Sequence, residues 1–377
     1  MKLKSLFSLA LLFILIILKT AQAQHKTLLF AGSYTGGKPD KGIYVFQFDT
    51  KTGSLSPVSN AENVINPSFI TLSPNGQYLY ACSETSLPTE GSISAFKIES
   101  GKLAFINKQP SGGENPAHLT TDKSGKYVIA GNYSGGSVVV MTTNEDGSLN
   151  PYNQLIKFED SSINKERQEK SHIHQVVFSP QQNFVFLPDL GADKIRAFRF
   201  DSKNTKPLVS ADDLTVKATL GSGPRHFVFH LNQKYGYCIE ELSGTVSAYS
   251  YKNGKLNAFQ KILSCSKIKE TYACADIHIS PDGLFLYASN RGDGENTISI
   301  FSINQTNGKL KLVGHESTYG EKPRNFTIDP SGKFLLVANQ TTGNVVVFRR
   351  NKKTGLLTKL KDEINVPNVS CLQMRIY

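Results

Sequence analysis

Short hydrophobic runs, rich in Val, Ile, Leu, Phe and Tyr, alternate with polar turns along most of the chain. Six stretches share one pattern: an apolar run, a turn such as SPNG or DPSG, and a second apolar run. They begin at Asn66, Asn115, His172, Gly223, Ala273 and Lys322. Short runs of β-branched and aromatic residues between Gly, Pro, Asn, Asp and Ser predict pairs of β-strands.

These strand pairs recur at a nearly constant interval. With the second residue of each stretch as reference, the successive steps are 49, 57, 51, 50 and 49 residues. Each pair is followed by a third run, such as GSISAFKI or NTISIFSI, and then by a Gly-Lys-Leu or Gly-Ser-Leu turn and a fourth run. Four short strands in about fifty residues are typical of a β-propeller blade, which buries its faces only against neighbouring blades.

The two ends of the chain together predict a seventh blade. Residues 26–59 supply three strands without a first one, and residues 365–377 supply a single strand. Joining them closes the ring and removes the exposed sheet edges that favour aggregation. We therefore predict an all-β fold, a seven-bladed β-propeller with four-stranded blades, built as one domain from residues 24–377. Six blades with loose ends is the alternative.

The first 23 residues have the pattern of a secretory signal. Lys2 and Lys4 precede an apolar run from Leu6 to Leu18, and the small residues of Ala21-Gln22-Ala23 follow. This order of charged, apolar and small residues is typical of a signal peptide, here cut before Gln24. The apolar run is short for a membrane span, and no later stretch is suitable. We expect a periplasmic or secreted protein without a membrane span; a retained N-terminal anchor is the alternative.

Composition and charge change this picture little. The chain has no Trp and three Met, and its formal net charge is +11, or about +8 without the predicted signal. The lysines are scattered through turns such as SGK, NGK and KKTG. This distribution predicts a solvated basic surface with a mild preference for small anions, and we expect no nucleic-acid partner. We also expect a monomer.

The five cysteines do not form a disulfide framework. Cys82, Cys238 and Cys371 lie within predicted strands, where cysteine usually acts as a small buried residue. Cys265 and Cys274 flank a short polar loop, and a disulfide between them is left open because secreted proteins permit one. There is no CxxC motif and no zinc-ligand spacing, so we expect no metal and no cofactor.

Charged and titratable residues concentrate at one rim of the predicted ring. In a blade, the start of the first strand and the end of the second strand lie at the same rim, and the first strands line the central channel. The starts of first strands carry His118, His174, Arg225, His226, Arg324 and Asn325. The ends of second strands carry Glu241 and Arg291. Because these groups converge on the channel mouth, the sequence predicts a ligand site there.

Structural roles compete with this interpretation. Asn and Asp at strand ends usually bond to nearby backbone, and four of them end second strands: Asn132, Asp189, Asn290 and Asn339. His172 and His174 share a strand face and could ligate a metal, but no third ligand is evident. The arginines after Pro224 and Pro323 are harder to explain structurally, because a guanidinium at a channel mouth needs a carboxylate or a substrate anion.

Several motifs resemble those of the bacterial lactonase family of seven-bladed propellers. They run from AGSYTGG through HIHQVVFSP, PDLGADKIRAF, GPRHFVFH, IEEL and ASNRG to KPRNFTIDPSGKFLLVANQ, over nearly the whole chain after the predicted signal. This family includes cofactor-independent 6-phosphogluconolactonases and the fungal carboxy-cis,cis-muconate cyclase. The resemblance implies an active site of one His, two Arg and one Glu around the channel mouth.

Carried onto this chain, the resemblance implies specific residues. The His is His174, with His172 as its rival; the first Arg is Arg225, and the Glu is Glu241. The second Arg is Arg291 or Arg324, a choice that the motifs leave open. We assign catalysis to His174, Arg225, Glu241 and Arg291, and substrate binding to His172, His226, Arg324, Asn325 and His118.

The leading hypothesis for function is hydrolysis of a sugar-derived lactone, similar to 6-phosphogluconolactone, without a metal. Glu241 or His174 would activate water as a general base, and the arginines would bind the substrate anion and stabilise the oxyanion. A lyase or cyclase using the same residues is one alternative. A secreted propeller that binds a ligand or a protein without catalysis is the other.

Overall fold

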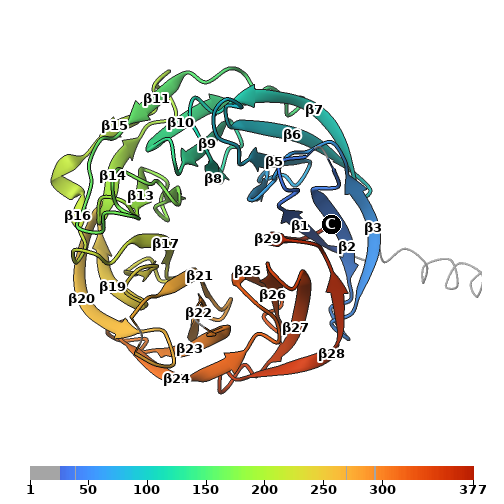
Figure 1. The fold of residues 1–377 in the computed structure, drawn as a ribbon, viewed down its shortest axis with the longest axis vertical. Coiled ribbons are helices and arrows are strands. Elements are labelled where there is room, and N and C mark those ends of the chain that lie inside the picture. Colours follow the sequence, from blue (N-terminus) through green and yellow to red (C-terminus); the bar gives the residue numbers. More distant parts are fainter. Residues whose placement is uncertain (1–25, 39, 269, 293) are drawn as a thin grey trace, which may run out of the picture.

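We describe the protein from a computed structural model, of which residues 26–38, 40–268, 270–292 and 294–377 are described. These residues form seven antiparallel sheets arranged as blades around a central axis (Figure 1). The predicted all-β, seven-bladed propeller is confirmed, and a single 3₁₀ turn, η1 (Asp212–Leu214), is the helical part of the described chain. The predicted signal, residues 1–23, lies outside the described residues.

Blades 1 to 3 follow the chain from its N-terminal side, and each strand is given from the axis outward. Blade 1 contains β29 (Val369–Ile376), β1 (Thr27–Ser33), β2 (Ile43–Phe48) and β3 (Leu55–Ala61). Blade 2 contains β4 (Ile70–Leu72), β5 (Tyr78–Ser83), β6 (Ser92–Glu99) and β7 (Lys102–Pro110). Blade 3 contains β8 (Pro116–Thr121), β9 (Tyr127–Asn132), β10 (Ser137–Thr142) and β11 (Gln154–Lys157).

Blade 4 departs from the pattern, and blade 5 returns to it. Blade 4 contains β12 (Val177–Phe178), β13 (Phe184–Asp189), β14 (Lys194–Phe200), β15 (Leu208–Ser210) and a fifth strand, β16 (Val216–Lys217), which also pairs with β14. Blade 5 contains β17 (Pro224–Phe229), β18 (Tyr235–Glu240), β19 (Thr245–Lys252) and β20 (Lys255–Leu263). The prediction of four strands per blade therefore holds except in blade 4.

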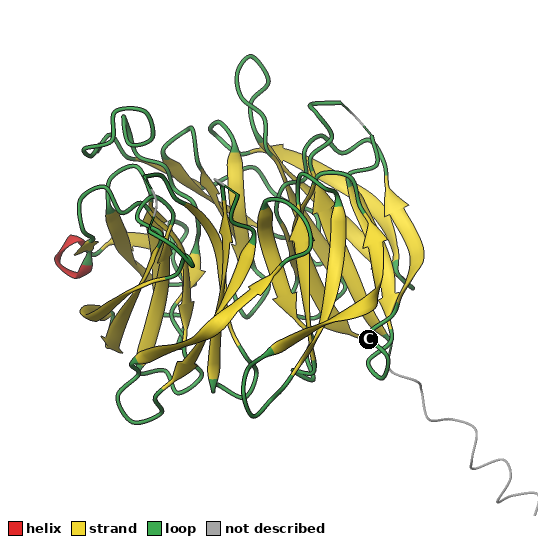
Figure 2. Ribbon diagram, turned by 60° about the horizontal axis from the view of Figure 1, so that its bottom comes forward, coloured by secondary structure: helices red, strands yellow, loops and turns green. Residues whose placement is uncertain are grey.

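Blades 6 and 7 complete the ring. Blade 6 contains β21 (Ala273–Ile279), β22 (Phe285–Arg291), β23 (Thr297–Ile303) and β24 (Leu310–Ser317). Blade 7 contains β25 (Pro323–Ile328), β26 (Phe334–Asn339), β27 (Asn344–Arg350) and β28 (Leu357–Asn365). Figure 2 shows the strands running between two faces of the molecule, with loops gathered at both faces.

The ring closes as predicted, by one C-terminal strand joining three N-terminal strands. β29 pairs antiparallel with β1, with Thr27 opposite Ile376 and Gly32 opposite Cys371. Figure 1 shows these two strands, at opposite ends of the colour scale, side by side. Because β1 thereby pairs with β29 on one side and β2 on the other, the N-terminal strand is not left as an open sheet edge.

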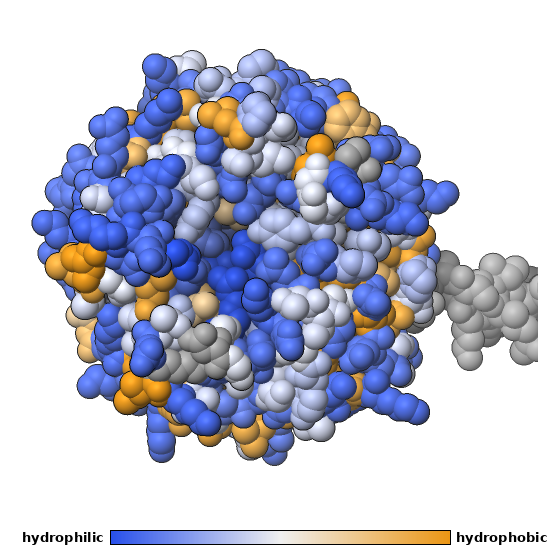
Figure 3. Space-filling model, viewed as in Figure 1, coloured by the Kyte–Doolittle hydropathy of each residue, from blue (hydrophilic) through white to orange (hydrophobic). Residues whose placement is uncertain are grey.

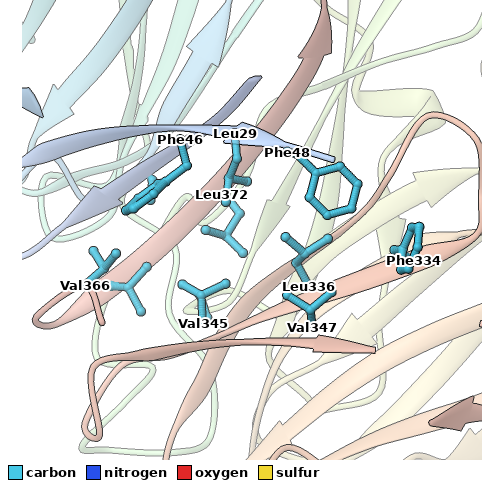
Figure 4. Close-up of a cluster of buried hydrophobic side chains, with 12 residues drawn as sticks. Leu29, Phe46, Phe48, Phe334, Leu336, Val345, Val347, Val366 and Leu372 are labelled. Atoms are coloured by element: carbon cyan, nitrogen blue, oxygen red, sulfur yellow. The ribbon is translucent and has the colours of Figure 1, made fainter. Parts of the chain in front are cut away.

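The hydrophobic core lies between neighbouring blades. Between blades 7 and 1, Leu336 and Val345 pack against Leu29, Phe46 and Leu372 (Figure 4). Leu29 and Leu336 are fully buried. Burying one such side chain contributes roughly 1.5–3 kcal/mol, so every pair of blades adds several such contributions. The ring is therefore held by many similar contacts, and the channel is free to carry polar groups.

A β-bulge recurs where the first strand of a blade begins. In β17, Pro224 faces Glu240 and His226 faces Ile239, so that Arg225 has no partner opposite it. In β25, Pro323 faces Asn339 and Asn325 faces Ala338, which leaves Arg324 in the same position. Bulges turn the side chain of the extra residue away from the regular alternation. They explain how arginines in β-strands reach the channel mouth.

The structure bears on two further points, membrane-spanning segments and the disulfide between Cys265 and Cys274. No helix among the described residues has the length and apolar character that crossing a membrane requires. The sulfur atoms of Cys265 and Cys274 lie 3.5 Å apart without a bond between them, and both thiols are free in this structure. Hydrogen bonding to Cys265 and burial raise the pKa of Cys274, so its thiol stays protonated at neutral pH.

Candidate active site

Glu241 is the centre of the polar groups at the channel mouth. It follows β18 directly, and its carboxylate accepts hydrogen bonds from Arg225 Nε at 2.8 Å and Arg291 Nη2 at 3.2 Å through Oε2. Arg167 Nη2 donates to Oε1 at 2.6 Å. The predicted proximity of Arg225 and Glu241, sixteen residues apart in sequence, is confirmed. We call Glu241, Arg167, Arg225 and Arg291 the mouth cluster.

The charges of the mouth cluster stabilise one another. Burial alone would raise the pKa of Glu241, but Arg291, Arg225 and Arg167 together lower it to about 2. Burial and the neighbouring Arg291 lower the pKa of Arg225 to about 9, which still keeps its guanidinium charged at neutral pH. Arg225 is 1% exposed, so it depends on Glu241 and on the carbonyl of Ala275, which accepts from Nη1 at 2.6 Å.

A cavity of about 400 Å³ opens above this cluster, a size that suits a small-molecule ligand. Its polar lining comes from all seven blades and the loop between β11 and β12: Tyr34, Glu84, Tyr133, Arg167, His174, Glu241, Arg291, Lys322, Arg324 and Gln340. Viewed down the ring axis, strongly hydrophilic side chains gather in the hollow at the centre (Figure 3). The cavity therefore offers mainly charged groups to a ligand.

Arg324 differs from the other arginines of the cavity. Among the described residues it forms no ion pair, and its guanidinium lies 5.3 Å from the centre of the Tyr34 ring. Tyr34 in turn donates its hydroxyl to Glu84 Oε2 at 2.8 Å. Burial alone would lower the pKa of Arg324, but Tyr34, Glu84 and Glu241 raise it. Arg324 is thus a charged donor available to an anionic ligand, whereas Arg291 is already bonded to Glu241.

His174 is the histidine that lines the cavity. It is 5% exposed and lies edge-on to the Tyr133 ring, with 5.4 Å between ring centres. Burial, then the positive charges of Arg225 and its neighbours, hold the pKa of His174 well below its ordinary value. The imidazole is therefore neutral at pH 7 and can accept a proton.

His172, the rival of His174, does not line the cavity. Its ring stacks on Tyr133 with 4.4 Å between centres, and its Nδ1 lies 3.0 Å from the Tyr133 carbonyl oxygen. Its Nε2 lies 3.2 Å from the Glu169 carboxylate. The structure thus places His172 behind Tyr133, where it supports a residue of the cavity wall.

Three other predicted substrate-binding residues lie below the cavity. His118 packs on Phe69 with 4.1 Å between ring centres and does not line the cavity. It does not line a second, smaller space of about 10 Å³ below the cavity either. His226 and Asn325 both bond to Asp276: His226 Nδ1 lies 2.7 Å from Oδ1, and the Asn325 amide donates to Oδ2. His278 Nε2 lies 2.9 Å from Oδ2. We call Asp276, His226, His278 and Asn325 the lower cluster.

The predicted structural roles of the strand-end residues are confirmed. Asn132 donates its amide to the Ser111 carbonyl at 2.9 Å, and Asn339 donates to the Thr318 carbonyl at 3.0 Å. Asn290 donates to Ser299 Oγ at 2.7 Å. Asp189 accepts from Arg196 and from the backbone N–H of His172. These four side chains join neighbouring strands and stay out of the cavity lining.

Several site residues were missed in the sequence. Arg167 and Tyr133 line the cavity, and Arg167 lies in the loop between β11 and β12. That loop is the reason for the 57-residue step between blades 3 and 4, so the irregular spacing was a signal for an insertion with its own role. Asp276 stands at the repeat position of His226, and Tyr133 stands at that of Glu241, so the repeat itself was a signal for both. The likeness of AGSYTGG to AGNYSGG places Tyr34 at the position of Tyr133. Within the described residues, no group of three or more His, Cys, Asp or Glu side chains is arranged to hold a metal ion.

Comparison with known proteins shows close similarity along the chain. Residues 28–374 match the family described as "Lactonase, 7-bladed beta-propeller". A 6-phosphogluconolactonase of Formosa agariphila is 51% identical over 353 residues, which are 93% of this chain and 99% of that protein. A 6-phosphogluconolactonase of Bacillus subtilis is 36% identical over 357 residues, 92% of this chain and 98% of that protein.

Solved structures give the same result. The periplasmic gluconolactonase of Pseudomonas aeruginosa superposes with a TM-score of 0.86 at 32% identity, covering 93% of this chain and 99% of that one. A crystal structure of a Bacteroides fragilis protein superposes with a TM-score of 0.88 at 37% identity, covering 95% of this chain and all of that one.

Proposed function

This chain belongs to the lactonase family of seven-bladed β-propellers, and on that premise we propose that it hydrolyses the lactone of a sugar acid at the channel mouth. The observation that carries the proposal is that His174 and Arg324 line the same cavity. Neutral His174 can accept a proton, and Arg324 has a charge that no carboxylate of the described residues neutralises by direct contact. Hydrolysis of an anionic lactone requires both functions.

His174 is the general base in this proposal, and Glu241 is the residue that positions the arginines. A carboxylate whose pKa lies near 2 is a weak base, which argues against Glu241 as the proton acceptor. The arginines also weaken His174 as a base in the resting protein. An anionic substrate beside Arg324 offsets their positive charge, so that the pKa of His174 rises when the substrate binds.

The proton and bond changes follow directly. His174 takes a proton from a water molecule while the water oxygen adds to the lactone carbonyl carbon. Arginine side chains of the mouth stabilise the negative charge that develops on the carbonyl oxygen. The bond between that carbon and the ring oxygen then breaks, and His174 returns the proton to the ring oxygen. The product is the open-chain sugar acid.

The charge of the cavity supports an anionic substrate. Arg167, Arg291, Arg324 and Lys322 face two carboxylates, Glu84 and Glu241. A phosphate or carboxylate group would bind to Arg324 with Lys322 beside it, because charge-assisted hydrogen bonds to guanidinium are strong. Relatives named 6-phosphogluconolactonase support a phosphorylated sugar lactone as the substrate.

We further propose that the protein works as a monomer in the periplasm or outside the cell, after removal of residues 1–23. The support is the order of charged, apolar and small residues in this segment. Similarity to a periplasmic gluconolactonase points to the same compartment. Sequencing of the N-terminus of the protein from cell fractions tests the proposal. A cytoplasmic protein that still begins at Met1 would refute it.

The activity test uses purified protein with 6-phosphogluconolactone and with glucono-1,5-lactone, each corrected for spontaneous hydrolysis. We expect hydrolysis of at least one of them above the uncatalysed rate, and a loss of about 10²–10⁴-fold in His174→Gln. Arg199→Ala is the matched surface control, since Arg199 is exposed and outside the cavity. A folded protein that accelerates neither reaction, or that converts only carboxy-cis,cis-muconate, would refute the proposed function.

A further inference from the structure

Three residues that each carry a buried polar atom without a hydrogen-bond partner among the described residues line one small space below the cavity. These atoms are Ser68 Oγ, His174 Nδ1 and His226 Nε2. Their residues are only 3–5% exposed, and all three line a single small space of about 10 Å³ beneath the channel mouth. This is about the volume that one water molecule needs, and a buried water typically bonds to about three such groups.

The lower cluster determines which nitrogen of His226 carries the proton. Asp276 accepts at Oδ1 from the backbone N–H of Ile277 at 2.9 Å, and at Oδ2 from the amide of Asn325. Burial alone would raise the pKa of Asp276, but His278 and His226 hold it well below its ordinary value. An ionised carboxylate only accepts hydrogen bonds, so His226 Nδ1 must donate to it. His226 Nε2 is then an unbonded acceptor on a residue that lines the small space.

His174 stands between the small space and the cavity, because it lines both. Its ring centre lies 5.1 Å from that of His226, with the two rings edge-to-face. The separation leaves the two imidazoles without a direct hydrogen bond, and a single water between them would link them. Ser68 Oγ can both donate and accept, so it adapts to either orientation of that water.

We propose that Ser68, His174 and His226 bind one structural water molecule, and that Asp276 and His226 act through it as positioning residues. His174 Nδ1–H donates to the water, the water donates to His226 Nε2, and His226 Nδ1–H donates to Asp276. This chain of bonds keeps the Nε2 lone pair of His174 available to the cavity. The role in turnover rests on the proposed function, whereas the water site does not.

The series of hydrogen bonds from His174 to Asp276 also stabilises the protonated form of His174 during the reaction. When His174 Nε2 takes a proton, its positive charge is opposed by the nearby arginines. The negative charge of Asp276, reached through the water and His226, offsets part of that cost. The titratable and charged groups that face the two histidines from the neighbouring strands are Tyr133, Arg225, Arg324, His118, Asp276 and His278.

The first experiment needs no substrate. In ¹⁵N NMR spectra of the resting protein, we expect a proton on Nδ1 and none on Nε2 in both His174 and His226. A crystal structure should show one water bonded to both imidazoles and to Ser68. Protonation of His226 at Nε2, or a dry space between the rings, would overturn the proposal.

The second experiment separates positioning from binding. Asp276→Asn and His226→Gln should each lower kcat by about 10²–10⁴-fold while KM changes little, because a triad-like relay supports the base and not substrate binding. His230→Gln is the matched control, since His230 is equally buried in the same blade but bonds to the Gly283 carbonyl, outside the site. It should keep the wild-type kcat.

The outcomes are distinct. If Asp276→Asn does not fold, His226→Gln carries the kinetic test. If both variants fold and keep the wild-type kcat, the positioning role is refuted even though the enzyme is a lactonase. If the wild-type protein hydrolyses no lactone, the proposed function fails, and the NMR and crystallographic results alone decide whether the water site exists.

Discussion

The mouth cluster and the lower cluster each surround one buried carboxylate, but with different partners. Glu241 is bonded to three arginines, whose charge is permanent near neutral pH. Asp276 is bonded to two histidines and an amide, groups that are neutral or can titrate. The first arrangement provides positive charge at the site where a ligand enters, and the second orients neutral side chains beneath it.

This difference explains why the two carboxylates have different roles although both are ionised. Glu241 neutralises one of the three charges around it, so the mouth remains cationic and suits an anionic ligand. Asp276 receives hydrogen bonds from every side and is fully used in orienting its neighbours. The role of a buried carboxylate therefore depends on its hydrogen-bond partners, and its burial and pKa alone do not reveal that role.

The largest expected effect comes from removing the charge of Glu241. Glu241→Gln leaves three arginines without their carboxylate, and we expect a loss of about 3–5 kcal/mol in the free energy of unfolding. Lactone turnover should also be lost. Thermal unfolding and the lactone assay measure the two effects.

Glu240→Gln is the matched control for that variant. Glu240 is adjacent and equally buried, but it bonds to Thr245, Ser247 and Lys261 outside the cavity. Turnover per folded molecule should stay at the wild-type value in this variant. Equal loss of turnover in both variants would contradict the special role of Glu241.

The pH dependence of stability should separate the two clusters. In the folded protein, burial beside Arg225 lowers the pKa of His226 from 6.5 to about 4. Below pH 6.5 His226 binds a proton in the unfolded chain but not in the folded protein, so this residue alone lowers the free energy of unfolding by about 3 kcal/mol as the pH drops from 6.5 to 4. Glu241 stabilises the fold fully above about pH 4.5, its ordinary pKa, and this contribution disappears as the pH falls through about 2.

Denaturant unfolding at a series of pH values checks this prediction. His226→Gln should make the dependence between pH 6.5 and 4 less steep, since the buried His118 and His174 still contribute to it, and should leave the loss at lower pH. Glu241→Gln should keep the dependence between pH 6.5 and 4 and remove the loss at lower pH. Stability that stays constant between pH 6.5 and 4 in the wild-type protein would show that the lower cluster does not hold His226 neutral.

A smaller effect is expected from Arg324→Ala. Arg324 has no ion-pair partner among the described residues, so the variant should unfold at nearly the wild-type temperature. The KM for 6-phosphogluconolactone should rise by about 10- to 100-fold, the value of one or two charge-assisted hydrogen bonds. The KM for uncharged glucono-1,5-lactone should rise much less. An equal rise for both substrates would show that Arg324 does not bind the anionic group.

The smallest effect is expected from His172→Gln. His172 supports Tyr133 from behind and does not line the cavity. We expect kcat to fall by less than about tenfold, equivalent to less than about 1.4 kcal/mol. Comparison with His174→Gln under the same conditions tests which histidine of the HIH motif acts in catalysis. A larger loss in His172→Gln would reverse the assignment.

The fold was predictable because its information is local and repeated. Each apolar run and turn predicts a strand pair, and the pattern recurs until the ring is complete. Closure by β29 and β1 followed from the unpaired runs at the two ends. Blade 4 was predicted less well, because its fifth strand, β16, has only two residues and no clear hydrophobic pattern.

The site was predictable only in part. Equivalent positions in the repeat identified Arg225, Glu241, Arg291 and Arg324, because the rim of a propeller follows from the strand order. The same reasoning included His118, His226 and Asn325, which the structure places below the cavity, while His172, taken from the HIH motif, lies behind Tyr133. It omitted Arg167, whose loop has no counterpart in the other blades.

The sequence by itself determined the strands, the seven blades, the closure of the ring and the rim at which charged residues gather, since all of these follow from patterns of neighbouring residues. Only the tertiary structure decided which of those residues meet. Bulges turn Arg225 and Arg324 toward the channel, an inserted loop brings Arg167 to Glu241, and Asp276 orients His226 below. The contacts of Arg167 with Glu241 and of Asp276 with His226 join residues 74 and 50 positions apart in the chain, so no local pattern could specify them.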